Sequence, residues 1–417
     1  MSKKKNKIEK SESLSKNAWR KFKKDKLALF GLSIIIISSI IAIFGSHLRP
    51  DKSEHANQRI AEIKFKQPGF STIVLLEKNN RKTQQRSFYD KMFFGGKDNE
   101  FINHAITENY AFEGDKLTWE IYSENGKSGS KKEKHVADIL YPLSYDNQFA
   151  VNPNNQDEVS FITVNGEKIT RSISEMKTEI EENNIINRTY WLGTDRAGRD
   201  MLSLIMASLL VSLSVGLIAV LISLTIGITL GALAGYFRGW VDEMIMWIIN
   251  VIWSIPTLLL VIAISVSFGK DFTIVFIAVG ITMWVEVARI VRGSVLSIRE
   301  KEFIEAGKAL GYKSYRIIFK HVLPNVVGPI IVVAAANFAA AILIEAGLSF
   351  VGIGVEAPQP SLGGMVNEYK DYIRQDGMPY LVILPGLAIV ILVLSFMLIG
   401  NGLRDALDNK SIETSGE

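Results

Sequence analysis

The chain has 417 residues, and its 48% hydrophobic and 22% charged fractions lie near the averages for soluble domains. The charges are unevenly spread, because 46 of the 90 charged residues lie in residues 48–200 and long stretches elsewhere carry none. Such stretches exclude a single soluble globule and indicate a chain that crosses a bilayer. The absence of cysteine excludes a disulfide framework, a thiolate metal site and a cysteine nucleophile in this chain.

Residues 1–26 form a basic segment, with 11 Lys or Arg against 3 Asp or Glu, that we expect in the cytosol. Residues 27–47 are the first predicted span, since about 20 apolar residues at about 1.5 Å each match a hydrocarbon core of about 30 Å. A signal peptide is the alternative, but residues 47–50 (His-Leu-Arg-Pro) stand where a small-residue cleavage site would lie. Trp19 and Phe22, among lysines, predict contact with anionic lipid, whereas nucleic-acid binding lacks an accompanying folded module.

Residues 48–190 separate the first span from the second and are expected to form a β-rich α+β extracytoplasmic domain. Residues 70–76, 117–122 and 159–164 have strand composition, and Asn165-Gly166 is a hairpin-turn signal. The insert has no nucleophile motif and no metal-ligand spacing. Its expected role is therefore docking or delivery, with a passive insertion as the alternative.

Residues 191–409 form a predicted membrane core with five further spans, at about residues 209–235, 244–268, 272–289, 325–350 and 380–403. Lys and Arg then concentrate in short cytosolic segments, above all in the loop at residues 290–324. Both termini, including the tail at residues 410–417, are expected in the cytosol. The sequence thus predicts an all-α polytopic membrane protein with six transmembrane helices and one inserted domain.

The loop at residues 290–324 is expected to form two short helices that break at Gly311, with Ser314 capping the second and Pro324 ending it. The second helix has an apolar face made of Tyr315, Ile318, Phe319 and Val322, and the opposite face is basic. Such an element can lie on the bilayer or can transmit movement from a soluble partner to the spans.

Four motifs follow one another in the core. They are residues 191–200 (Trp-Leu-Gly-Thr-Asp-Arg-Ala-Gly-Arg-Asp), Glu305-Ala306-Gly307 with Gly311 and Leu323-Pro324, residues 345–354 with 358–364, and residues 400–408. The second resembles the EAA loop of ABC importer permeases. Together the motifs resemble the C-type permease of the dipeptide, oligopeptide and nickel branch, over about residues 17–44 and 190–409 and not over the insert. Gly307 departs from the family pattern, in which alanine is usual.

The resemblance implies a type I ABC importer permease fold in a bacterial-type cytoplasmic membrane. It implies a peptide importer in which this chain forms half of the translocation path beside a homologous B-type permease. Two ABC ATPase subunits and an extracytoplasmic substrate-binding protein complete the implied assembly. ATP and magnesium would bind to the ATPase subunits, in agreement with the lack of a G-x-x-x-x-G-K-[ST] loop here. For this chain we expect no bound cofactor, no catalytic residue and no metal ligand.

The resemblance also selects candidate residues. Those expected to couple the permease to the ATPase are Glu305, Ala306, Gly307, Gly311, Leu323 and Pro324. Glu286 and Glu345 are candidates for a gate or the translocation path. Glu286 is a candidate because carboxylates within a membrane span are often functional, although it can instead pair with Arg289. Glu345 is expected near the outer surface, where its role is gating or structural. Candidates for contact with the binding protein are Thr194, Asp195, Arg196 and Arg199. Thr194, Asp195 and Asp200 can alternatively cap the following helix.

Two other functions remain open from the sequence. The same machine could carry nickel or another small solute, since cargo choice normally belongs to the binding protein. A membrane receptor with a sensing insert is the alternative from another class, but it would need a cytosolic output module. No H-E-x-x-H or G-x-S-x-G motif supports an intramembrane enzyme.

Overall fold

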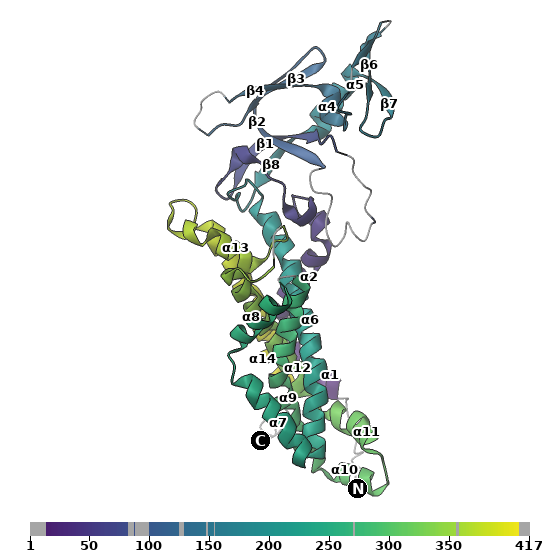
Figure 1. The fold of residues 1–417 in the computed structure, drawn as a ribbon, viewed down its shortest axis with the longest axis vertical. Helices are drawn as coiled ribbons and strands as arrows, with labels where there is room; N and C mark the ends of the chain where they lie inside the picture. Colours follow the sequence, from purple (N-terminus) through teal and green to yellow (C-terminus); the bar gives the residue numbers. More distant parts are fainter. Residues whose placement is uncertain are drawn as a thin grey trace, which may run out of the picture. The chain divides into compact units, whose positions relative to one another are not determined.

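The computed structural model describes residues 14–81, 87, 100–124, 129–146, 149–153, 155–269, 272–355 and 358–407. The first half of the basic N-terminal segment and the tail at residues 410–417 lie outside the described residues. The chain divides into two compact units (Figure 1). We call Met1–Ser39, Ser212–Glu356 and Leu387–Glu417 the helical unit, and Ile40–Val211 and Ala357–Gly386 the sheet unit.

Long apolar helices dominate the helical unit (Figure 1). Among the described residues, five helices are long and apolar enough to cross a membrane: Lys26–Leu48 (α2), Met201–Phe237 (α6), Thr273–Arg299 within α9 (Phe272–Arg299), Ser314–Val351 including α12 (Leu323–Val351), and Tyr380–Leu407 (α14). Gly239–Trp253 (α7) and Thr257–Phe268 (α8) form a pair bent by 85°, which makes a sixth if the pair is one span. A polytopic helical membrane protein with five or six candidate spans is thereby confirmed.

Helix α6 packs closely against α9 through glycines spaced four residues apart. Gly227, Gly231 and Gly235 lie on one face of α6, and a Cβ atom at Gly231 would come within 2.5 Å of the Ala288 carbonyl oxygen. Small residues at this spacing let two helix backbones approach, which is how membrane helices gain packing energy without a hydrophobic driving force. The α6–α9 contact continues into an apolar cluster that includes Val287, Val291 and Val295.

The loop at residues 290–324 differs from the sequence expectation at Pro324. The loop contains α10 (Glu302–Ala309), α11 (Ser314–Ile317) and a π-helical turn (Ile318–Val322) that leads into α12 without interruption. Pro324 lies at the start of α12 and does not end a helix, since its missing N–H matters little in a first turn. Lys313, not Ser314, occupies the cap position of α11, and its side chain makes no capping hydrogen bond.

The sheet unit contains two antiparallel sheets, drawn in blue to teal in Figure 1. The larger has the order β4-β3-β2-β1-β8, and the smaller has the order β5-β6-β7. The strands are Phe70–Lys78 (β1), Phe101–Glu113 (β2), Lys116–Ile121 (β3), Lys131–His135 (β4), Ala150–Asn152 (β5), Asn155–Ile162 (β6), Lys168–Ser172 (β7) and Ile185–Tyr190 (β8). Strands β1 and β8 come from opposite ends of the insert, and Phe70 pairs directly with Tyr190.

Three of these strands follow the sequence prediction closely. The segments predicted from composition fall in β1, β3 and β6, and Gly166 lies in the β6–β7 turn with a φ of 83°, which glycine adopts without steric cost. Short helices Val136–Leu140 (α4) and Ile173–Glu179 (α5) add to the core around Trp119, Ile139 and Met176. Helix Leu362–Tyr369 (α13) also belongs to the sheet unit and follows α12 in the chain.

Candidate functional site

The loop at residues 290–324, which we call the coupling loop after its expected role, is shaped by the end of α10. The N–H of Gly311 donates to the Lys308 carbonyl at 2.9 Å, and the N–H of Tyr312 donates to the Gly307 carbonyl at 3.1 Å. This is the Schellman pattern, and it needs the left-handed backbone that Gly311 supplies at a φ of 74°. The predicted break at Gly311 is therefore present, with its hydrogen bonds satisfied.

The loop has one buried face and one exposed face. Ile304, Ile317, Ile318 and Val322 are buried in a cluster with residues of α6 and α9. Four large apolar side chains of the loop are exposed, namely Phe303, Leu310, Tyr315 and Phe319. The predicted apolar face of the second helix is therefore divided, because Tyr315 and Phe319 are exposed whereas Ile318 and Val322 are buried. Glu305 and Ala306 are exposed, whereas Gly307 is buried beneath the Tyr312 ring, whose Cδ2 would lie 3.6 Å from an added Cβ. Leu323 is half-buried in the same cluster, and Pro324 is exposed.

An apolar surface beside an exposed carboxylate suits a protein partner. Exposed apolar patches with a polar rim mark interaction sites in general. Among the residues that the structure describes, no ion pair engages Glu305, so its charge is available to a basic group outside this chain. The buried face fixes the loop to α6 and α9, and a push on the exposed face would reach those helices.

A cluster of charged and polar side chains forms around the motif at residues 191–200. The Arg199 Nε donates to Asp195 Oδ2 at 2.6 Å, and the Tyr369 hydroxyl donates to the same oxygen at 2.8 Å. Arg199 also reaches Glu368 at 3.3 Å, and Arg196 pairs with Glu368 at 2.9 Å. The motif and α13, more than 150 residues apart in sequence, are thus joined within the sheet unit.

Burial decides what these residues can touch. Thr194 and Asp195 have 0% exposure, and the Thr194 hydroxyl accepts from the Lys66 N–H at 2.9 Å. Arg196 keeps 56% of its side chain exposed. Of the four candidates for contact with a binding protein, Arg196 therefore offers the largest exposed surface, and the two fully buried residues hold the loop in place.

The charges of this cluster are tuned by burial and by pairing. Burial alone lowers the pKa of Arg199, but Asp195, Tyr369 and Glu368 outweigh it and raise that pKa above its usual value. Burial raises the pKa of the Asp200 carboxyl despite its hydrogen bonds with Ser203. Asp200 accepts from the Ser203 N–H at 3.0 Å, so it is the residue that caps α6.

The two intramembrane carboxylates differ in their surroundings. Glu345 is fully buried, and it accepts hydrogen bonds from Ser349 at 2.8 Å and Ser212 at 3.5 Å. Glu286 is exposed on α9. In the described part of the chain no ion pair joins it to Arg289, which instead donates to Asn250 at 3.2 Å and stacks on Trp253.

Sequence reasoning missed a strong ion pair between α7 and α9. Arg292 donates through Nε and an Nη to the two oxygens of Asp242, at 2.5 and 2.6 Å. Glu368 and Tyr369 were also missed. No spacing rule links residues 50 or 170 positions apart, so these contacts become visible only in the fold. Within the described residues, no group of three or more His, Asp or Glu is arranged to hold a metal ion.

The sequence of the chain is similar to those of known transport proteins. Residues 227–412 match the family "Binding-protein-dependent transport system inner membrane component", and residues 13–68 match "N-terminal TM domain of oligopeptide transport permease C". The dipeptide transport system permease protein DppC of Alkalihalophilus pseudofirmus is 44% identical over 221 residues, which are 53% of this chain and 72% of that protein. The oligopeptide transport system permease protein OppC of Bacillus subtilis is 37% identical over 54% of this chain and 73% of its own length.

Two further similarities complete the comparison. The glutathione transport system permease protein GsiD of Pectobacterium atrosepticum is 41% identical over 53% of this chain and 73% of that protein. A solved structure of the MetNI methionine ABC transporter aligns with a TM-score of 0.43 and 19% identity, over 50% of this chain and 98% of its own. The sequence matches define the membrane component of a binding-protein-dependent transport system. Within that class, the chain belongs to the C-type permeases of the peptide ABC importer family.

Proposed function

We propose that this chain is the permease subunit of an ATP-driven peptide importer. It forms half of a translocation path with a B-type permease, in a type I fold, and receives peptides from an extracytoplasmic binding protein. The cargoes in the names of its relatives are dipeptides, glutathione and oligopeptides, and they support peptides over nickel. We place both termini in the cytosol and residues 48–190 outside.

The coupling loop carries this proposal. Two ABC ATPase subunits, which bind ATP and magnesium, dock with the assembly, and one of them contacts the exposed side of α10 and α11. The supporting observation is the pairing of an outward apolar surface with an exposed Glu305, on a loop whose other face is packed into α6 and α9. Glu345, with its two serine partners, is our candidate for a gate.

Glu305→Lys tests the docking. A charge reversal opposes an ion pair with a basic residue of the ATPase, so we expect transport and substrate-stimulated ATP hydrolysis to fall at least tenfold in reconstituted complexes. Glu167→Lys, the same charge change in the exposed β6–β7 turn, controls for insertion and expression. Unchanged transport and ATPase co-purification in Glu305→Lys would contradict the docking assignment.

The insert is proposed as a docking or delivery module for the binding protein. Its test uses the pairing of Phe70 with Tyr190, because antiparallel partners lie about 5 Å apart and a short Gly/Ser linker can replace residues 71–189. We expect stimulation by the loaded binding protein to weaken, while basal ATP hydrolysis and assembly persist. Full import by the chain that lacks residues 71–189 would show that the insert is passive.

A further inference from the structure

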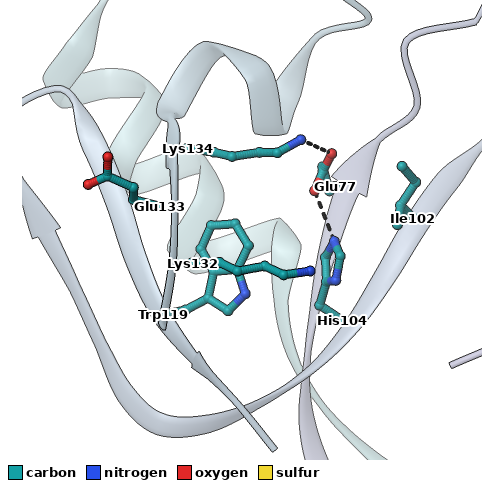
Figure 2. A pocket seen from close by; sticks show the side chains of 7 residues that line it. All are labelled: Glu77, Ile102, His104, Trp119, Lys132, Glu133 and Lys134. Atoms are coloured by element: carbon teal, nitrogen blue, oxygen red, sulfur yellow. Dashed lines mark hydrogen bonds and ion pairs between the residues drawn. The ribbon is translucent and has the colours of Figure 1, made fainter. Parts of the chain in front are cut away.

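The sheet unit contains a small pocket on one face of its larger sheet (Figure 2). The cavity has a volume of about 250 Å³ and is lined by Glu77, Ile102, His104, Trp119, Lys132, Glu133 and Lys134. These residues come from β1, β2, β3 and β4, four consecutive strands in the sheet order. The pocket therefore has a rigid floor that does not depend on loops.

The lining has two carboxylates and two lysines, and three of these four groups are engaged in ion pairs. Glu77 is buried, and its two oxygens are engaged by His104 at 2.9 Å and by Lys134 at 2.6 Å (Figure 2). Burial alone raises the pKa of Glu77, but these hydrogen bonds outweigh it and hold the pKa below its usual value, so the carboxylate and Lys134 neutralise each other. Figure 2 shows Glu133 directed away from Glu77, and Glu133 pairs with Lys116 at 2.9 Å.

Lys132 is the remaining charged side chain among those that line the pocket. It is the direct cross-strand partner of Trp119, so the two side chains are neighbours on one face of the sheet. In the described part of the chain, Lys132 makes no ion pair. Trp119 is 1% exposed, and its indole Nε1 has no hydrogen-bond acceptor among the described residues. A buried donor without an acceptor is costly, and an anionic ligand would supply one.

Size and polarity define the occupant. Pockets that enclose drug-sized ligands measure about 300–1,000 Å³, so this one takes a group of about one amino-acid residue. Ile102, which is 40% exposed, and the Trp119 ring provide an apolar wall beside the ammonium group. We propose that this pocket binds the C-terminal residue of a peptide, with the carboxylate at Lys132 and the Trp119 indole and an apolar side chain against Ile102. The choice of a peptide rests on the proposed transport function, whereas the choice of an apolar carboxylate rests on the pocket alone.

Binding of defined probes to the full chain, purified with its partner permease in nanodiscs, tests the proposal. The probes are the pentapeptide Ala-Ala-Ala-Ala-Leu, the same peptide with a C-terminal amide, and N-acetyl-leucine, each titrated by calorimetry. We expect the free-acid peptide to bind and the amide to bind at least tenfold more weakly, the size of a lost charge-assisted hydrogen bond. Lys132→Gln should weaken the free-acid peptide by a similar factor. Lys168→Gln, an exposed lysine on β7 in the other sheet, should not change it.

Trp119→Phe keeps an aromatic ring in the core and removes the N–H donor. We expect it to weaken the free-acid peptide several-fold while the amide is unaffected. Equal binding of the acid and the amide would contradict the proposal that the pocket binds a carboxylate. Binding that Lys132→Gln leaves unchanged would contradict it as well. Binding of N-acetyl-leucine without the peptide would overturn the peptide assignment alone, and it would do so without bearing on the coupling loop.

Discussion

Gly307 and Gly311 are four residues apart, but the structure requires glycine only at the second position. Gly307 has helical backbone, and an added Cβ would make an ordinary contact with Tyr312 at 3.6 Å. Gly311 has a φ of 74°, which costs a residue with a Cβ about 1–2 kcal/mol. The first glycine is thus a departure from the usual alanine that the structure tolerates, and the second is required by the turn.

Substitution by alanine should therefore have opposite effects at these positions. We expect Gly307→Ala to stabilise α10 by about 1 kcal/mol through helix propensity, and Gly311→Ala to destabilise the loop by a similar amount. Hydrogen exchange of the α10 amides in the purified complex measures both. Faster exchange in Gly307→Ala would contradict the packing described for Tyr312.

At the residue scale, the sequence predicts local features and misses distant ones. The break at Gly311 and the turn at Gly166 follow from the backbone preferences of glycine alone. The hydrogen bond of Tyr369 to Asp195 does not, because 174 residues separate them and nothing local marks either as a partner. The burial of Asp195 was equally hidden, since a charged residue in a polar motif looks exposed until its partners are known.

Helices α6 and α9 make the element-scale contact that is easiest to test. A Cβ at Gly231 would lie 2.5 Å from the Ala288 carbonyl oxygen, which is backbone and can move only if the helices separate. Gly231→Ala should therefore cost about 1–3 kcal/mol, as overpacking usually does. Gly293 on α9 has no described atom within 4 Å of an added Cβ, so Gly293→Ala should be neutral or stabilising.

The measurement is thermal unfolding of the detergent-solubilised complex for both variants. A lower midpoint for Gly231→Ala with an unchanged one for Gly293→Ala is the expected result. Equal midpoints for the two variants would mean that α6 and α9 can separate at little cost.

The sequence located helix ends that coincide with the end of an apolar stretch. It missed features that depend on local backbone geometry. The apolar stretches located the long helices within a few residues at several ends, as for α2, predicted at 27–47 and found at Lys26–Leu48. The predicted end of a helix at Pro324 was wrong, because a π-helical segment carries the chain into α12 and composition does not report such a segment. Strands β2, β4 and β8 were not singled out either, since their polar residues weaken the alternation that marks a strand.

At the scale of the whole molecule, the proposed orientation can be checked without knowing the cargo. The chain has no cysteine, so single cysteines report on one position each. Glu167→Cys in the β6–β7 turn should react with an impermeant maleimide on cells whose outer surface is accessible. Lys313→Cys in the coupling loop should react only after the membrane is opened. The reverse pattern would place the coupling loop outside and remove it from any cytosolic ATPase.

The 85° bend between α7 and α8 restricts how this pair of helices can lie in a bilayer. Ser254, Ile255 and Pro256 lie between the two helices, near the middle of that segment, and all three are exposed in this chain. Irregular backbone at membrane depth persists only where protein covers it or water reaches it, since hydrocarbon offers its carbonyl groups no donors. If the pair crosses as one span, a lone copy would leave this break against lipid. We therefore expect a second protein, such as the proposed partner permease, to cover this break, and we expect a chain expressed without it to be degraded faster in cells.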